Sequence, residues 1–265
     1  MKKLKIILTL SFLSVFSLNA QNLSITYKVT VNANDAILST STNYDLILNG
    51  SKSAYYNNND SLKQFKYQSF INETKKIGEL TRVKLSDNHY AYVKQDFFFK
   101  DYEKDTLIYN ELIVSKKAFV GEKINLIDWK IQSKSDTIIL NQKCLKAIGK
   151  FRGRTYDAYF SPSLSQRGGP WKFDGLPGII LSVKSQDDYF VIEPTKIVKN
   201  SKSQNTIFNV YDNKKAISWA LFKKRFKEKL IRQFKKLKSL SEDGEKGSIE
   251  ITDRIEDLGI GKLSF

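Results

Sequence analysis

The stretch Asn22–Val31, NLSITYKVTV, alternates apolar and polar residues along its whole length. In an extended chain its leucine, isoleucine, tyrosine and valines fall on one side, and its serine, threonines and lysine on the other. This period of two is typical of a β-strand that buries one face. The same pattern returns through most of the chain and decides its fold class.

Further segments of strand character follow as far as about residue 212, separated by turns rich in Asn, Asp, Ser and Gly. They read YDLILN, HYAYVKQDFFF, TLIYNELIV, NLIDWKI, DTIILN, CLKAIGKF, TYDAYF, GIILSVKS, DYFVIEP and TIFNVY. No helical pattern lies between them, so the sequence favours antiparallel neighbours over βαβ units. We predict a mainly β protein, an antiparallel meander curved into a partial barrel or a sandwich.

One amphipathic helix is expected between Ala216 and Leu240. Its apolar residues recur at helical spacing and form one stripe, and lysines and arginines cover the rest. The stripe consists of Trp219, Phe222, Phe226, Leu230, Phe234, Leu237 and Leu240. The predicted organisation is therefore a β-rich domain over 21–212, a basic helix over 213–240 and an acidic tail over 241–265, which is mobile or returns as an edge strand at GSIEIT.

Residues 1–20 have the layout of a secretory signal peptide. Three lysines precede an apolar run over 6–18, which is shorter than a bilayer-spanning helix requires. We expect cleavage near Gln21, with an uncleaved anchor as the alternative, and no transmembrane segment in the mature chain. The one cysteine, Cys144, is far from this point, so the expected product is unlipidated and lies in the periplasm or outside the cell.

The net charge of +16 is concentrated in one element. Without the three leader lysines the chain has 41 basic and 28 acidic residues, a net charge of +13, and residues 214–240 alone contribute +10. Such a helix suits anionic lipid, a polyanion or an acidic partner, or is simply a solvated face. Nucleic acid is not expected, because the chain is exported and no aromatic platform accompanies the charge.

Catalytic chemistry has few candidate residues. The chain has one histidine, His89, and no G-x-S-x-G elbow, and one histidine with one cysteine is a poor supply of zinc ligands. We therefore expect no catalytic residue, metal or cofactor, and interpret Cys144 as a buried apolar residue. Carboxylate pairs, Asp187 with Asp188 and Asp253 with Glu256, leave an acid/base hydrolase open, although turn chemistry already explains the first pair.

The region 149–178 concentrates glycine and proline. In FRGR, Gly153 either is the first central residue of a hairpin turn, or the strand runs straight through, with Arg152 and Arg154 on one face and Gly153 leaving room opposite. Both alternatives hold two guanidinium groups close together. Downstream, Pro177 and Gly178 predict a type II turn, and Asp174 with Gly175 signals another, so Leu176 lies between two reversals.

The stretch Gly169–Leu181, GPWKFDGLPGIIL, allows two interpretations. Its side chains Trp171, Phe173 and Leu176 can fill one end of the curved sheet as a plug. Alternatively, a rim of Arg, Trp and Asp side chains binds a ligand, with Asp174 in reach of an arginine. The candidate ligand-binding residues are Arg152, Arg154, Trp171, Lys172 and Asp174, and the residues assigned to the backbone of the motif are Gly153, Gly169, Pro170, Phe173, Gly175, Leu176, Pro177 and Gly178.

At these residues the chain resembles the GLPGLI family of exported bacterial proteins, whose name describes the motif written here as Gly175–Ile180. The resemblance includes FRGR at 151–154, the aromatic pair Tyr159–Phe160 and the approach from Gly169, and in looser form it covers most of 22–200. Ile179 and Tyr159 depart from the usual leucine and tryptophan. The resemblance implies an envelope protein and no particular activity.

Three hypotheses follow. The first is an exported, non-catalytic β-protein that binds a small ligand or an envelope partner through the cluster at Arg152 and Arg154. The second is an envelope hydrolase that uses carboxylates, or His89 with a serine. The third is a structural surface protein bound to lipid or polyanion through the helix at 214–238.

Overall fold

The structure is a computed structural model that describes part of the chain. The described residues are 22–32, 39–57, 71–77, 80–85, 97–113, 116–164, 166–199, 215–238, 247–251 and 254–264. The elements are β1 (Leu23–Asn32), β2 (Ser39–Asn49), β3 (Lys52–Asn57), β4 (Ile71–Ile77), β5 (Leu80–Leu85), β6 (Phe97–Asp101), β7 (Thr106–Ile113), β8 (Lys116–Glu122), β9 (Trp129–Ile139), β10 (Gln142–Phe151), β11 (Arg154–Ser161), β12 (Ile179–Ser185), β13 (Phe190–Lys199), α1 (Trp219–Lys238), β14 (Gly247–Ile251) and β15 (Leu263–Ser264). His89 and the expected strand TIFNVY lie outside the described residues, as does the predicted signal peptide.

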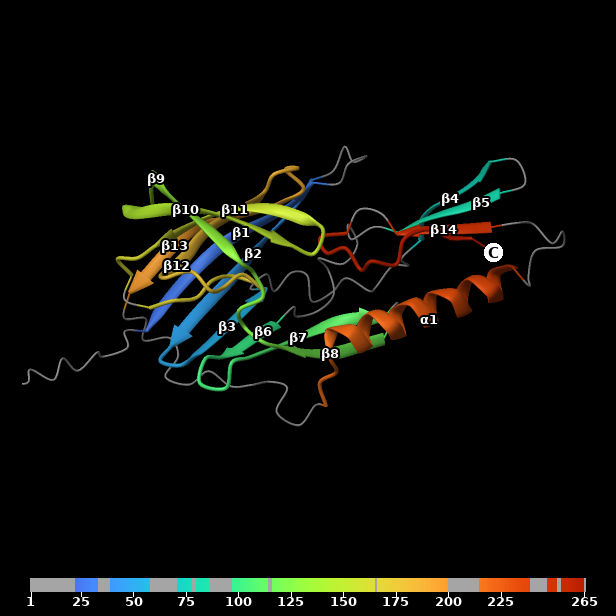
Figure 1. Cartoon of the computed structure of the whole chain (residues 1–265), viewed down its shortest axis with the longest axis horizontal. Coiled ribbons are helices and arrows are strands. Elements are labelled where there is room, and N and C mark those ends of the chain that lie inside the picture. Colours follow the sequence, from blue (N-terminus) through green and yellow to red (C-terminus); the bar gives the residue numbers. More distant parts are fainter. Residues whose placement is uncertain are drawn as a thin grey trace, which may run out of the picture.

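The main sheet has eleven strands in the order β8-β7-β6-β3-β2-β1-β13-β12-β11-β10-β9. Each half is an antiparallel meander, interrupted in the first half by β4 and β5 of a second sheet between β3 and β6, and the halves meet where β1 pairs with β13. In β1 the apolar residues are buried and their neighbours more exposed, as the alternation predicts. The predicted fold class, mainly β with an antiparallel curved sheet and one C-terminal helix, is confirmed (Figure 1).

The sheet is open, and its curvature follows from the connection between its edges. Strands β8 and β9 are consecutive in sequence yet form the two opposite edges. A flat sheet of this size would separate its edges by about 48 Å. The connecting residues 123–128 can span at most about 25 Å. The sheet must therefore curl until the end of β8 and the start of β9 approach each other.

Residues 166–178, called the core loop below, place a buried run, 168–174, inside this curve. The Trp171 ring contacts Phe98 of β6 at 6.5 Å and Phe190 of β13 at 5.2 Å between centroids, so the loop contacts both halves of the sheet. Phe173 and Leu176 are also buried. Trp171, Phe173 and Leu176 belong to the buried core, which agrees with the plug interpretation.

Helix α1 begins after Ser218, whose hydroxyl oxygen accepts a hydrogen bond from the Leu221 backbone N–H at 3.2 Å, an N-cap. Its apolar stripe is buried at Phe222, Phe226, Leu230 and Phe234. The helix lies beside β7 and β8, away from β9 (Figure 1). No described helix is long and apolar enough to cross a membrane.

A second, four-stranded sheet has the order β15-β14-β5-β4. The expected strand at GSIEIT forms as β14, but it is an inner strand and not an edge, because it pairs with both β15 and β5. The chain between these two C-terminal strands returns to the main sheet. Residues 254–258, called the C-terminal segment below, dock there.

Candidate functional site

The turn between β10 and β11 presents the first predicted arginine. Arg152 and Gly153 are its two central residues, with φ of +42° and +91°, as in a type I′ hairpin. The hairpin alternative is thus correct, but Gly153 is the second central residue and not the first. Positive φ is uncommon for a residue with a side chain, so Arg152 is held there by its surroundings.

The turns of the core loop differ from the prediction at one point. The Gly178 N–H donates to the Leu176 carbonyl at 2.8 Å, so Pro177 is the centre of a three-residue turn and not position i+1 of a type II turn. A Cβ on Gly178 would lie 2.4 Å from the Ser161 carbonyl oxygen. Close backbone approach, more than turn type, therefore requires glycine at this position.

A buried ion pair holds the core loop to β6. Lys100 and Asp174 are 1% and 2% exposed, and Lys100 Nζ lies 2.8 Å from Asp174 Oδ2. The same ammonium donates to the carbonyls of Gly169 and Phe173 at 3.0 and 2.9 Å, and Tyr102 donates its hydroxyl to Asp174 at 3.0 Å. Burial lowers the pKa of Lys100, and Asp174 offsets part of that effect.

The expected contact of Asp174 with an arginine is wrong. Besides Lys100 and Tyr102, its Oδ1 accepts the Gly175 N–H at 2.8 Å, and its backbone carbonyl accepts Trp129 Nε1–H at 2.7 Å. These partners fix the carboxylate against β6. The sequence pattern missed them because Lys100 follows the apolar residues of FFFKD and looks like the solvated end of a strand.

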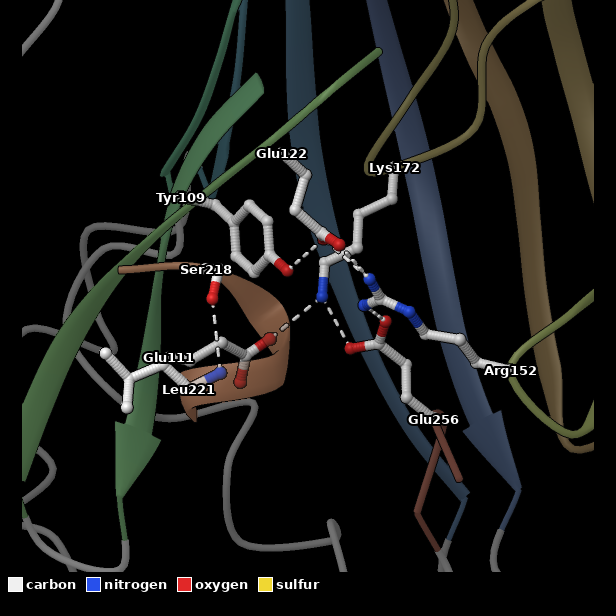
Figure 2. A network of polar contacts seen from close by, with 8 residues as sticks. All are labelled: Tyr109, Glu111, Glu122, Arg152, Lys172, Ser218, Leu221 and Glu256. Atoms are coloured by element: carbon white, nitrogen blue, oxygen red, sulfur yellow. Dashed lines mark hydrogen bonds and ion pairs between the residues drawn. The ribbon is translucent and has the colours of Figure 1, made fainter. Parts of the chain in front are cut away.

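A second buried centre, called the charge cluster below, joins two cations to three carboxylates (Figure 2). Lys172 Nζ lies 2.9 Å from Glu111 Oε1 and 2.5 Å from Glu256 Oε2. Arg152 contacts Glu256 Oε1 and places Nη2 at 2.5 and 2.6 Å from the two oxygens of Glu122. Lys172 has no exposed surface. Two of the predicted ligand-binding residues therefore converge, and a carboxylate of the chain itself lies between them.

Aromatic rings enclose the charge cluster. The Arg152 guanidinium carbon lies 3.6 Å from the centroid of the Trp219 ring, and Lys172 Nζ lies 4.0 Å from that of Tyr109. Tyr109 also donates its hydroxyl to Glu122 at 2.6 Å. Cations over ring faces gain further attraction when water is excluded. Trp219 at the start of α1 thereby ties the helix to the cluster.

The cluster carries a formal charge of −1, because three carboxylates face two cations. Burial by itself raises the pKa of Glu256, but Lys172 and Arg152 outweigh it and hold this pKa below its ordinary value. Burial and the carboxylates of Glu256 and Glu111 raise the pKa of Tyr109 well above its ordinary value. Tyr109 therefore stays a neutral hydrogen-bond donor at neutral pH.

The C-terminal segment supplies Glu256 and fits the hairpin turn through its backbone as well. The Asp257 N–H donates to the Arg152 carbonyl at 2.8 Å, and Arg154 Nη1 donates to the Ile255 carbonyl at 2.7 Å. A Cβ on Gly153 would lie 2.7 Å from the Asp257 Cβ. Glycine in FRGR thus has a second use, which is to let this segment approach.

The remaining predicted residues have structural partners. Arg154 pairs with Asp187 at 2.9 Å and does not reach the cluster carboxylates, and Trp171 packs in the core with its ring centroid 5.0 Å from Lys172 Nζ. Cys144 is buried, which fits its interpretation as an apolar residue, and burial raises its thiol pKa to about 11. The turn at Asp187 and Asp188 is confirmed, with φ of +59° at Asp188.

Sequence reasoning missed most carboxylates of the cluster. Glu111 and Glu122 lie on β7 and β8, where a single acidic residue resembles an ordinary surface position. The sequence pattern indicates Glu256 only as a tail residue paired with Asp253, which lies outside the described residues. Throughout the described ranges, no group of three His, Cys, Asp or Glu side chains is arranged to hold a metal ion.

The comparisons with known proteins give a fold likeness. Two solved structures of PNGF-II, in space groups C2 and P21, match with a TM-score of 0.52 and sequence identities of 14% and 15%. The match covers 79% of this chain and 33% and 34% of those chains, so it spans about a third of their length. No family model and no curated protein matches the sequence. At this identity the likeness concerns the fold alone.

Proposed function

We propose that this chain is an exported, non-catalytic β-protein of the cell envelope that binds an acidic partner through the exposed side of α1. Export rests on the signal-peptide layout of residues 1–20 and on the resemblance to the GLPGLI family. The observation that carries the binding role is the basic face, formed by Lys224, Arg225, Lys227 and Lys235, which has no ion pair with any described acidic residue.

The placement of the apolar stripe favours a polyanionic partner over insertion of the helix into lipid. An amphipathic helix that lies in a membrane interface buries its apolar side in the acyl region. Here Phe222, Phe226 and Leu230 are buried against the rest of the protein. The exposed side therefore offers charge alone, in a row about 17 Å long from Lys224 to Lys235. Such a row fits an acidic protein surface or another extended polyanion.

The charge cluster supports the non-catalytic part of the proposal. A general base needs access to a substrate proton and a pKa suited to the exchange. Glu256 is buried, contacts Lys172 and Arg152 through its two oxygens, and has a lowered pKa. Both cations of this centre are therefore occupied by carboxylates of the chain itself, which is what a structural centre requires.

The test measures binding of fluorescent poly-L-glutamate to the purified mature chain by anisotropy at low ionic strength. Replacing Lys224, Lys227 and Lys235 together by glutamine is expected to weaken binding by about tenfold or more, since each cation contributes to the attraction. Binding to the wild-type chain is expected to fall as salt is raised.

The matched control removes the same charge elsewhere. Lys52, Lys150 and Lys196 are exposed on strands of the main sheet. Their combined replacement by glutamine should leave most of the binding intact. Equal losses in the two variants would mean that net charge, and not α1, drives the association, and would refute the proposal.

A further inference from the structure

Exposed apolar side chains gather on one hairpin of the main sheet. Among the described residues, the large apolar side chains with high exposure are Ile131, Ile138 and Leu140, at 46%, 75% and 42%. All three belong to β9 or to its turn into β10, at the side of the molecule away from α1 (Figure 1). Residues 138–143, called the hairpin tip below, contain the most exposed of them.

The turn of the hairpin tip holds a leucine in an unfavourable conformation. Leu140 and Asn141 have φ of +47° and +61°, which defines a type I′ turn that Asn-Gly would form more readily. Positive φ is rare for a branched apolar residue and costs free energy. Leu140 gains little packing in return, because it is exposed. The turn thus presents an apolar side chain outward at a conformational cost.

Exposed lysines lie on the two strands that lead to the apolar tip. Lys143 lies directly opposite Ile138 in the pairing of β10 with β9, and Lys134 and Lys130 are exposed along β9. The exposed acid of this strand, Asp136, lies 3.1 Å from Lys143. Apolar side chains with lysines nearby complement an anionic membrane, because the apolar interior of the membrane lies below a layer of negatively charged headgroups.

Addition of a partner strand to β9 fits these observations less well. The pairing of β9 with β10 shifts between Leu145 and Lys146, so that residues 133–135 have no opposite partner. Such a bulge, together with lysines on the strand, is how natural edge strands discourage pairing with another chain. Two of the three exposed apolar residues, Ile138 and Leu140, also lie at or next to the turn, where no strand could be added.

We propose that the hairpin tip inserts Ile138 and Leu140 into the surface of an anionic phospholipid membrane, with Lys134 and Lys143 among the headgroups. This contact is separate from the acidic-partner surface on α1. The tip anchors the protein weakly, since two side chains give only part of the attraction that stable membrane binding needs.

The test is co-sedimentation with vesicles of phosphatidylcholine alone and of an equal mixture of phosphatidylcholine and phosphatidylglycerol. The wild-type chain should bind the mixed vesicles and bind the neutral ones less. Leu140→Asn should weaken binding about tenfold through loss of apolar contact. Its melting temperature should be unchanged or higher, because Asn tolerates positive φ. Ile138→Thr, which keeps a β-branched strand residue, should weaken binding similarly.

The control is Ile131→Thr, on the same strand but beyond the bulge, which should bind as wild type does. The glutamine variant of Lys224, Lys227 and Lys235 should also retain vesicle binding while losing poly-L-glutamate, which separates the two proposals. Tip variants that bind vesicles like wild type would overturn the inference, as would a wild-type chain that does not bind the mixed vesicles. Self-association abolished by the tip variants would assign the tip to a second copy and overturn it too.

Discussion

The two buried charged centres are built on different plans. Lys100 and Asp174 form a one-to-one pair between β6 and the core loop, and backbone carbonyls complete the ammonium's contacts. In the charge cluster each cation has two carboxylate partners, because Lys172 contacts Glu111 and Glu256 while Arg152 contacts Glu256 and Glu122. In the first centre no second carboxylate of the described residues contacts Lys100 if Asp174 is lost. In the charge cluster the two cations share Glu256, and each has another carboxylate partner as well.

This difference predicts how each centre responds when it is broken. Removing one partner of a buried pair leaves an uncompensated charge away from water, which is costly. A cation that retains a second carboxylate loses less. Loss of Asp174 from the first centre should therefore lower the free energy of unfolding strongly. Loss of Glu256 from the charge cluster should lower it less and should mainly release the C-terminal segment.

The largest expected effect is that of Asp174→Asn. The amide keeps the shape of the side chain but leaves Lys100 without a counter-charge, and its NH2 group meets donors from Lys100, Tyr102 or Gly175. We expect a loss of about 3–5 kcal/mol in the free energy of unfolding, measured by urea denaturation.

A double variant sharpens this result. Lys100→Met combined with Asp174→Asn removes the buried cation as well and should be more stable than Asp174→Asn alone. If the double variant is the less stable of the two, the cost of the single variant does not come from the unpaired charge.

Glu256→Gln should cost less, about 1–3 kcal/mol, because Glu111 and Glu122 still neutralise the two cations. The loss should be concentrated in the C-terminal segment, with faster amide hydrogen exchange at Asp257, whose N–H donates to the Arg152 carbonyl. Exchange that accelerates equally throughout the main sheet would contradict this redundant arrangement.

The smallest effect concerns pH. The folded pKa of Glu256 lies below its unfolded value, so its contribution to stability is present at neutral pH and is lost as pH falls through the folded pKa. The stability of the wild-type chain should decline in acid more than that of Glu256→Gln, by at most about 1.4 kcal/mol per pH unit for one proton. Urea denaturation of both chains between neutral and acid pH measures the difference, and parallel curves would count against it.

The sequence predicted the fold class because alternation in segments such as Leu23–Asn32 reports burial of one strand face directly. It also located Arg152 and Lys172, whose neighbourhood is rich in glycine and proline. It did not predict their partners, since Glu111, Glu122 and Glu256 meet only after distant segments converge. A single acidic residue on a strand gives no local signal that distinguishes a buried counter-charge from a surface group.

The order of the strands in the main sheet could not be predicted from local sequence patterns either. Alternation shows that β8 and β9 are strands, but their positions at opposite edges depend on the pairing of β1 with β13. The expected edge strand at GSIEIT shows the same limit, since its inner position depends on β5 far upstream.

The pairing of β1 with β13 also has a consequence for when this protein can fold. Leu23 lies opposite Lys199, so the first strand waits for a partner that is synthesised after nearly the whole main sheet. Contacts between such distant residues slow folding, because the long intervening chain must be closed first. Until then β1 and β13 each pair on one side only, with β2 and β12, and leave their other edge open. The two halves can form in either order, but the sheet is completed only by a late, single joining event in its middle.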